Sequence, residues 1–197
     1  MKNRVVKTLT LATLLMASSV VADNLNVVTG ISGGYTYINV DQENQVGSFI
    51  LANEPTQDGY NVELKLGYKY DNNFQLTMNY QRVEFDDMFE NNVYVEVEYL
   101  YSAYKNFTPY IGGHFGISRL EWSENPINTL DNDVNSGSYI VGARAGTLYP
   151  LSENIALSME YIFSLTDHDT QLESGSAKAT LTHNFSHNLN FGLRYTF

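Results

Sequence analysis

The chain has 197 residues, 43% of them hydrophobic and 13% aromatic, and its formal net charge at pH 7 is −11. This length suits a single domain. The lack of cysteine excludes disulfides, thiolate metal sites and a thiol nucleophile. The acidic balance argues against nucleic acid or an anionic membrane surface as a partner for the bulk charge.

The first 22 residues have the three parts of a secretory signal peptide. Lys2, Arg4 and Lys7 precede an apolar run from Leu9 to Ala17, and small residues follow up to Ala22. A basic segment, a short apolar segment and a small-residue cleavage site are typical of export signals. We therefore expect residues 1–22 to be removed and residues 23–197 to form one mature domain.

After the signal, apolar and polar side chains alternate in eight stretches, which is the pattern of β-strands. The stretches cover 25–37, 60–71, 74–85, 93–102, 110–118, 138–149, 154–164 and 189–197. Short connections near 71–73, 105–107 and 150–153 separate them, with longer ones at 39–59, 86–92, 121–136 and 166–177. This alternation of short and long connections predicts an all-β fold, an eight-stranded antiparallel up-and-down transmembrane β-barrel. The last stretch should close it by pairing with the first.

The composition of the two strand faces indicates which one meets lipid. The polar face is rich in small residues, as a narrow barrel interior requires. Tyr and Phe gather near both ends of the apolar face, at Tyr68, Tyr70, Phe74, Tyr99, Tyr101, Tyr149, Tyr195 and Phe197 near the short turns, and at Tyr35, Tyr37, Tyr60, Tyr80, Phe85 and Tyr139 near the long connections. Two such aromatic girdles favour a membrane barrel over the alternatives, a soluble sandwich or a lipocalin-like barrel.

Charged side chains of both signs also lie on the polar face. They are Glu63, Lys65, Lys69, Glu96, Glu98, His114, Arg144, Glu160 and Arg194. Because unpaired charges in a narrow lumen are costly, we expect them to form one network that fills the barrel and leaves no wide channel. Turns centred on residues 152 and 106 would place Arg144 opposite Glu160, and Glu98 opposite His114.

The long connections are rich in carboxylates and contain no Lys or Arg. Solvation explains such acidic loops, and it is the interpretation that we prefer. Binding of Ca²⁺ or Mg²⁺ that bridges to lipopolysaccharide phosphates is the functional alternative, with Asp131, Asp133, Asp167 and Asp169 as candidates. Their spacing fits no specific calcium loop. We therefore predict no metal site and no cofactor.

One short segment holds the residue types of a hydrolase. His183, Ser186 and His187 lie close together in sequence. In a regular strand, both histidines would share the apolar face and the serine would lie on the other, which is poor geometry for a Ser–His pair. We therefore expect no enzyme and no catalytic residue, with a lipid A-modifying enzyme as an alternative.

Three segments of the mature chain resemble one known family. They are "PYIGGHFGIS" at 109–118, "YPLSENIALSMEYIF" at 149–163 and the final "FGLRYTF". Together with the signal, they resemble the OmpA/OmpX-like small outer-membrane β-barrels of Gram-negative bacteria, the outer membrane protein beta-barrel domain or opacity/porin-family type. The resemblance implies that a terminal Phe after alternating apolar residues is read by the outer-membrane assembly machinery. The residues concerned are Phe191, Leu193, Tyr195 and Phe197.

These observations predict an integral outer-membrane protein with a structural or interaction role, in envelope integrity, adhesion or stress resistance. Its acidic extracellular loops would carry that role, and its polar lumen would be plugged. The expected partners are outer-membrane lipids and lipopolysaccharide, the assembly machinery and an extracellular ligand that the sequence does not identify. We expect a monomer that binds no nucleic acid. A narrow porin for small solutes or ions is the leading alternative.

Overall fold

The computed structural model describes residues 26–46, 49–53, 56–70, 73–86, 88–101, 104, 106–122, 135–174 and 177–197. The expected signal peptide, residues 1–22, lies outside them, so its removal stays a prediction. The described residues form β1 (Val27–Val46), β2 (Phe49–Asn53), β3 (Thr56–Lys69), β4 (Phe74–Glu84), β5 (Met88–Leu100), β6 (Thr108–Trp122), β7 (Asn135–Pro150), β8 (Ile155–Ser174) and β9 (Ala177–Thr196). The described part of the chain contains no helix that could span a membrane.

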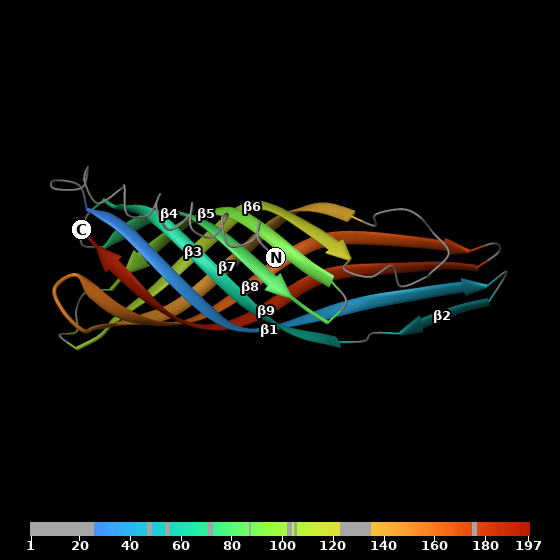
Figure 1. Ribbon diagram of the computed structural model, residues 1–197, viewed down its shortest axis with the longest axis horizontal. Coiled ribbons are helices and arrows are strands. Elements are labelled where there is room, and N and C mark those ends of the chain that lie inside the picture. The colour runs from blue at the N-terminus through green and yellow to red at the C-terminus, as the bar shows by residue number, and fades with distance from the viewer. Residues whose placement is uncertain are drawn as a thin grey trace, which may run out of the picture.

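The strands form one closed antiparallel barrel (Figure 1). Each of β3 to β8 pairs with the next strand in sequence, β1 pairs with β3, and β9 returns to pair with β1. The seam between first and last strands runs from Val28 opposite Thr196 to Val46 opposite Ala177. The eight-stranded barrel and its closure by the C-terminal strand are therefore confirmed. Strand β2 is additional and pairs only with the outer part of β1.

In the described part of the barrel, most buried side chains are polar and most large exposed ones are apolar, although Leu120, Ile140 and Ile162 are also buried inside. Along β3, Asn61, Glu63 and Lys65 are buried inside. Val62 and Leu66, which alternate with these residues along the strand, are exposed on the outer surface. Because successive side chains point to opposite faces of a strand, this strict alternation sends one residue class inward and the other outward. The packed core of this molecule is thus its lumen.

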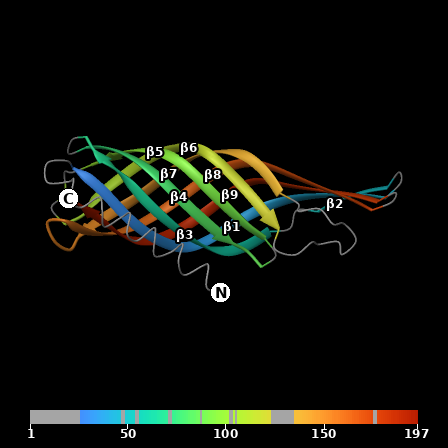
Figure 2. The ribbon, with the colours of Figure 1, turned by 45° about the horizontal axis from the view of Figure 1, so that its top comes forward.

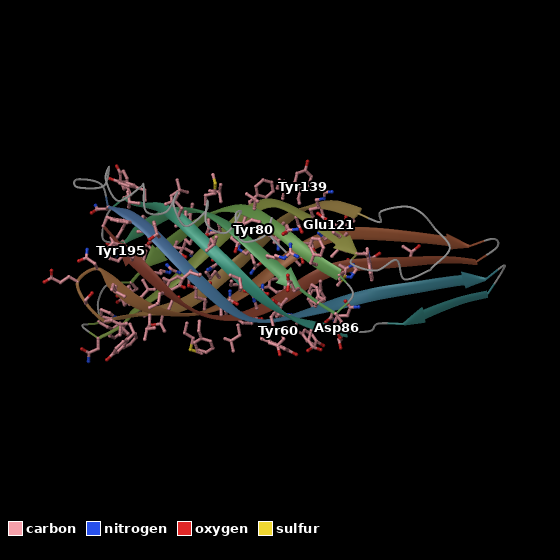
Figure 3. All side chains as sticks on the ribbon, in the orientation of Figure 1. Tyr60, Tyr80, Asp86, Glu121, Tyr139 and Tyr195 are labelled. Carbon is pink, nitrogen blue, oxygen red and sulfur yellow. The ribbon has the colours of Figure 1, made fainter. Side chains whose placement is uncertain are left out.

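Aromatic side chains lie on the outer surface near both ends of the barrel. Tyr60 and Tyr139 point outward toward one end, and Tyr195 lies near the other (Figure 3). The exposed aromatic residues at the end with the short turns include Tyr68, Tyr70, Phe74, Tyr99, Tyr101 and Tyr149. Those toward the opposite end include Tyr35, Tyr37 and Tyr80. Both aromatic girdles thus have members on the outer surface.

Three strands are much longer than the barrel wall requires. Strands β1, β8 and β9 have 20 residues each, whereas β4 has 11. A membrane-spanning strand needs about 9–11 residues. The surplus projects beyond one end of the barrel (Figures 1 and 2). There, residues 42–46, 49–53, 170–174 and 177–181 pair in the order β2-β1-β9-β8, and we call this sheet the strand extension.

The strand extension corrects the predicted connections. Residues 39–59 and 166–177 were expected to be long loops, but most of them are strand. Strand β5 likewise begins at Met88, within the connection expected at 86–92. Residues 42–53 and 170–174 lack the regular apolar–polar alternation that identifies strands, so the sequence did not predict them as strand.

Two predicted hairpin registers are also wrong, each by two residues. The observed pairs that replace them are Arg144 with Ile162, and Glu96 with His114. Each turn is centred one residue away from the position assumed. A shift of two residues leaves every side chain on its own face, whereas a shift of one would have turned the strand inside out.

Candidate functional site

Ionisable side chains from six strands meet in the middle of the lumen. All of these side chains are buried, and they are Glu63 and Lys65 on β3, Glu96 and Glu98 on β5, His114 on β6, Arg144 on β7, Glu160 on β8 and Arg194 on β9. Inward residues of a closed barrel have no other place to point. The sequence-predicted residue Lys69 is the exception, because it lies half-buried at the last position of β3 and takes part in none of the ion pairs described below.

Arg144 is the centre of this network. Its Nη2 lies 2.8 Å from Glu63 Oε2, and its Nε lies 2.8 Å from Glu96 Oε1. Its Nη1 forms a third ion pair with Glu160. Tyr94 supports the arrangement, because its hydroxyl accepts a hydrogen bond from Arg144 Nη2 and donates one to Glu63. One guanidinium therefore links β7 to β3, β5 and β8.

Arg194 forms a second centre on the closing strand. Its Nη1 and Nη2 donate to the two carboxylate oxygens of Glu98, at 2.5 and 3.0 Å. This two-bond geometry is the strongest that arginine and a carboxylate adopt. Nη2 also donates to Glu160 and to the hydroxyl of Tyr110, whose ring lies 4.4 Å from the guanidinium carbon. Arg194 thus ties β9 to β5, β6 and β8.

Lys65 and two neutral side chains complete the hydrogen bonding of Glu96 and Glu98. Lys65 Nζ donates to both Glu96 and Glu98. Gln75 donates to Glu98, and Asn79 donates to Glu96. The cluster has four carboxylates against three cations, so it is close to neutral overall. Buried ion pairs are tolerated when the remaining hydrogen bonds are made in this way.

The network leaves almost no free space. The hollow lined by Glu63, Lys65, Glu160 and Arg194 has a volume of about 10 Å³. A single water needs roughly 10–15 Å³ of such volume. His114 fills a neighbouring position, where its ring packs 4.8 Å from the ring of Tyr94 and its Nε2 lies 3.0 Å from Ser164 Oγ. The lumen is therefore packed with side chains at this level.

A second polar cluster lies nearer the strand extension, and the sequence analysis missed it. Ser118 Oγ donates to Glu90 Oε1 at 2.7 Å and lies 2.7 Å from His168 Nε2. The other ring nitrogen of His168 lies 3.3 Å from Ser136 Oγ. Glu90 was assigned to an acidic loop, but it is a buried lumen residue of β5. It has the same alternation phase as Glu96 and Glu98, and that signal could have identified it.

His183 faces inward, where a regular strand would have placed it on the apolar outer face. It is fully buried, and its ring centroid lies 6.3 Å from that of Trp122. The register of β9 shifts near Asn184 against both of its neighbours, which changes the face on which the preceding residues point. Such a β-bulge leaves no clear mark in the sequence.

The structure does not assemble the hydrolase that was considered around residue 186. Ser186 and His183 are both buried in the lumen, but neither ring nitrogen of His183 makes a hydrogen bond to the serine. His187 lies in an outer aromatic cluster and contacts the Tyr161 hydroxyl at 2.5 Å. Ser118 and His168 do touch, but the adjacent carboxylate is bonded to the serine. In a catalytic triad the acid instead orients the histidine. This cluster therefore joins β5, β6, β7 and β8 by hydrogen bonds at the mouth of the lumen.

The candidate metal ligands fall mostly outside the described residues. Asp131 and Asp133 lie in the undescribed segment 123–134, and only the backbone of Asp169 is described. Asp167 is exposed, and its backbone N–H donates to Ser138 Oγ at 2.9 Å. Within the described ranges, no group of three or more His, Asp or Glu side chains is arranged to hold a metal ion.

The last strand places its apolar residues on the outer surface. Phe191, Leu193 and Tyr195 are exposed there, and the ring of Phe197 packs edge-on against Tyr195, with centroids 4.7 Å apart. The backbone N–H of Phe197 donates to the carbonyl of Val27 at 3.0 Å. The chain end is therefore held in the closing seam, and its role in assembly stays a prediction.

A closed barrel with an apolar, aromatic-bordered exterior and a charged, packed interior is a transmembrane β-barrel. Residues 8–197 match the outer membrane protein beta-barrel domain family, and the chain belongs to this family. The protein is accordingly located in the cell outer membrane, as predicted. In such barrels the short turns face the periplasm and the longer connections face outward, which predicts an extracellular position for the strand extension.

Solved outer-membrane barrels share the fold at low sequence identity. Neisserial surface protein A is 15% identical with a TM-score of 0.61, and the match covers 87% of this chain and 97% of that one. OprG from Pseudomonas aeruginosa is 12% identical with a TM-score of 0.59, over the same shares of the two chains. AlkL, solved in lipid bilayers, is 14% identical with a TM-score of 0.55, over 88% and 91%. No curated protein matches the chain.

Proposed function

We propose that this protein is a structural and interaction component of the outer membrane that does not conduct solutes. The observation that carries this proposal is the double arginine network in the lumen. Arg144 and Arg194 together contact Glu63, Glu96, Glu98 and Glu160, which belong to three different strands. A hollow of about 10 Å³ at this level is too small for a hydrated ion or a sugar.

The free energy of these buried charges argues against an opening lumen. Removing one partner of a buried ion pair leaves an uncompensated charge, which costs about 3–5 kcal/mol. A passage through this level would have to break several such contacts at once. The network acts instead as a cross-brace, because each guanidinium joins strands on different sides of the barrel.

The strand extension supports an interaction role. Four paired segments stand outside the membrane, and a transmembrane barrel needs no such structure in order to insert. Exposed carboxylates lie toward the same end, at Asp58, Asp86 and Asp167, and Figure 3 shows Asp86 at the extracellular rim. We propose that adhesion or envelope integrity depends on this extension and on its acidic surroundings, while the barrel is its anchor.

A deletion strain tests this proposal when it is complemented by two forms of the protein. One form is the full chain, and the other replaces residues 42–53 and 170–181 by short Gly-Ser turns, which removes the strand extension. We expect the deletion to change adhesion or detergent resistance, and the shortened form to fail to restore them. Uptake of small hydrophilic solutes should be the same in all strains. Reduced uptake in the deletion strain would instead support the narrow porin.

A further inference from the structure

The backbone pairing between β7 and β8 ends early on the extracellular side, where the described residues connect the two strands only through hydrogen bonds that involve the side chains of Ser136 and Ser138. These strands pair from Pro150 opposite Ala156 up to Val141 opposite Leu165. Above that point, β7 continues to Asn135 along β6, while β8 continues to Ser174 along β9. A hollow of about 920 Å³ lies where this pairing ends, and we call it the β7–β8 hollow.

The β7–β8 hollow has an apolar half and a polar half. Its apolar side chains are Ile117, Tyr139, Val141 and Leu165, all exposed on the outer surface. Its polar residues are Ser118, Arg119, Ser136, Ser138, Thr166 and Asp167. On the outer face, the apolar residues lie nearer the membrane centre, and Arg119 on β6 and Asp167 on β8 lie toward the extracellular end. Ser118, Ser136 and Ser138 have the inward phase of their strands. The hollow is therefore amphipathic along the membrane normal.

Arg119 is one of two outward arginines that stand in a row at this height. Arg82 on β4 pairs with Asn91 on β5, and Asn91 pairs with Arg119 on β6. The guanidinium-bearing side chains are 40% and 61% exposed, so they are not lumen residues. The next outward row toward the membrane contains Tyr80, Val93, Ile117 and Tyr139. The arginine row thus lies directly above the aromatic girdle, at the level of lipid head groups.

The present partner of Arg119 is easily exchanged. Arg119 Nε lies 3.1 Å from Glu121 Oε1, and both side chains are in contact with solvent. Exposed ion pairs of this kind are weak. A phosphate can replace the carboxylate, because the planar guanidinium binds phosphate oxygens with two parallel hydrogen bonds. Asp167 also lines the hollow, but it is on β8, so the phosphate belongs on the β6 side.

We propose that the β7–β8 hollow binds one phosphorylated lipid of the outer leaflet, with its phosphate on Arg119 and an acyl chain along the apolar half. The charge of Arg119 selects this occupant, since an anionic head group above an apolar chain matches the order of Arg119 and Ile117 on β6. The lipid would cover this end of the β7–β8 pairing from the outside. This site is independent of whether the lumen conducts.

Native mass spectrometry of the barrel, purified from the outer membrane in non-ionic detergent, tests the proposal. The probes are monophosphorylated lipid A, the same lipid after removal of its phosphate, and inorganic phosphate alone. We expect one phosphorylated lipid per barrel. Arg119→Gln should weaken its binding about tenfold, the effect of losing one charge-assisted contact, and leave the dephosphorylated lipid unaffected. Tyr139→Ala should weaken both lipids.

Two matched variants separate this site from general attraction. Arg82→Gln removes an outward arginine that does not line the hollow, and Ile111→Ala removes an exposed apolar side chain lower on β6. Both should retain wild-type binding. Equal losses from Arg82→Gln and Arg119→Gln would overturn the proposal, as would equal affinity for both lipids or displacement by inorganic phosphate at similar concentration. Every variant is on the outer surface, and far-ultraviolet circular dichroism checks that each is folded.

Discussion

The lumen and the lipid-facing surface of this barrel are built on the same strands, yet they treat the same residue types differently. Arg144 in the lumen is fully buried and contacts three carboxylates. Arg82 on the outside is 40% exposed and has one carboxylate partner, Glu84, at 2.9 Å. The stability of this molecule therefore depends on ion pairs and hydrogen bonds among buried polar side chains, while most of its exposed apolar side chains face lipid.

The largest expected effect comes from the lumen. Arg144→Ala removes the shared partner of three buried carboxylates, and we expect it to lower the free energy of unfolding by about 3–5 kcal/mol. Urea unfolding in lipid vesicles, followed by tryptophan fluorescence, measures this change. A variant as stable as the wild type would show that the lumen charges are solvated.

A charge placed on the opposite face should have the next largest effect. Met78 is exposed on the outside of β4, near the middle of the strand. Met78→Arg should cost about 2–4 kcal/mol, because lipid cannot solvate the guanidinium. Met78→Leu is the control, with a change below about 1.5 kcal/mol. If both variants unfold at the same urea concentration, this face does not contact the bilayer core.

Two glycines on β6 sharpen the comparison through packing alone. A side chain on Gly116 would meet Tyr94 Cβ at 2.6 Å inside the lumen, whereas one on Gly113 would meet only the Gly142 carbonyl oxygen at 3.8 Å on the outside. We expect Gly116→Val to destabilise the barrel by about 1–3 kcal/mol, because the lumen is already full. Gly113→Val should leave the unfolding midpoint nearly unchanged. Equal midpoints for the two variants would argue for a loosely packed lumen.

The smallest effect should come from the exposed pair. Arg82→Ala removes an ion pair in contact with solvent, and such pairs contribute about 0–1 kcal/mol. The same unfolding assay gives a direct comparison with Arg144→Ala. A loss as large as that of the lumen variant would mean that the outer arginine has a structural role that its exposure does not indicate.

Much of the barrel could be predicted because lipid imposes a strict rule on the outward face. Residues such as Leu66 and Phe191 must be apolar where the strand crosses the membrane, so the alternation reveals the strand and its two faces. The closing seam followed from the same pattern in the last nine residues. Lumen membership followed too, since Glu63, Arg144 and Arg194 share the polar phase of their strands.

The remainder was lost where that rule does not apply. Residues 42–53 and 170–174 of the strand extension show no regular apolar–polar alternation, so they were predicted as parts of long loops. The inward turn of His183 depends on a β-bulge, which exchanges the two faces without any change of composition. The hairpin registers depend on the centre of each turn. An error of one residue in the turn centre gave Glu160 as the predicted partner of Arg144, whereas the observed partner is Ile162. The arginine still reaches Glu160 diagonally, because its side chain is long.

Single-channel recording in planar bilayers measures directly whether the charge network closes the lumen. The wild-type barrel should give no open-channel steps at any applied voltage. Arg144→Ala and Arg194→Ala, recorded at matched protein insertion, should be the first forms to admit ions if they fold. Steady conductance steps from the wild-type protein would contradict the account, because ions could then pass the level of Arg144 and Arg194.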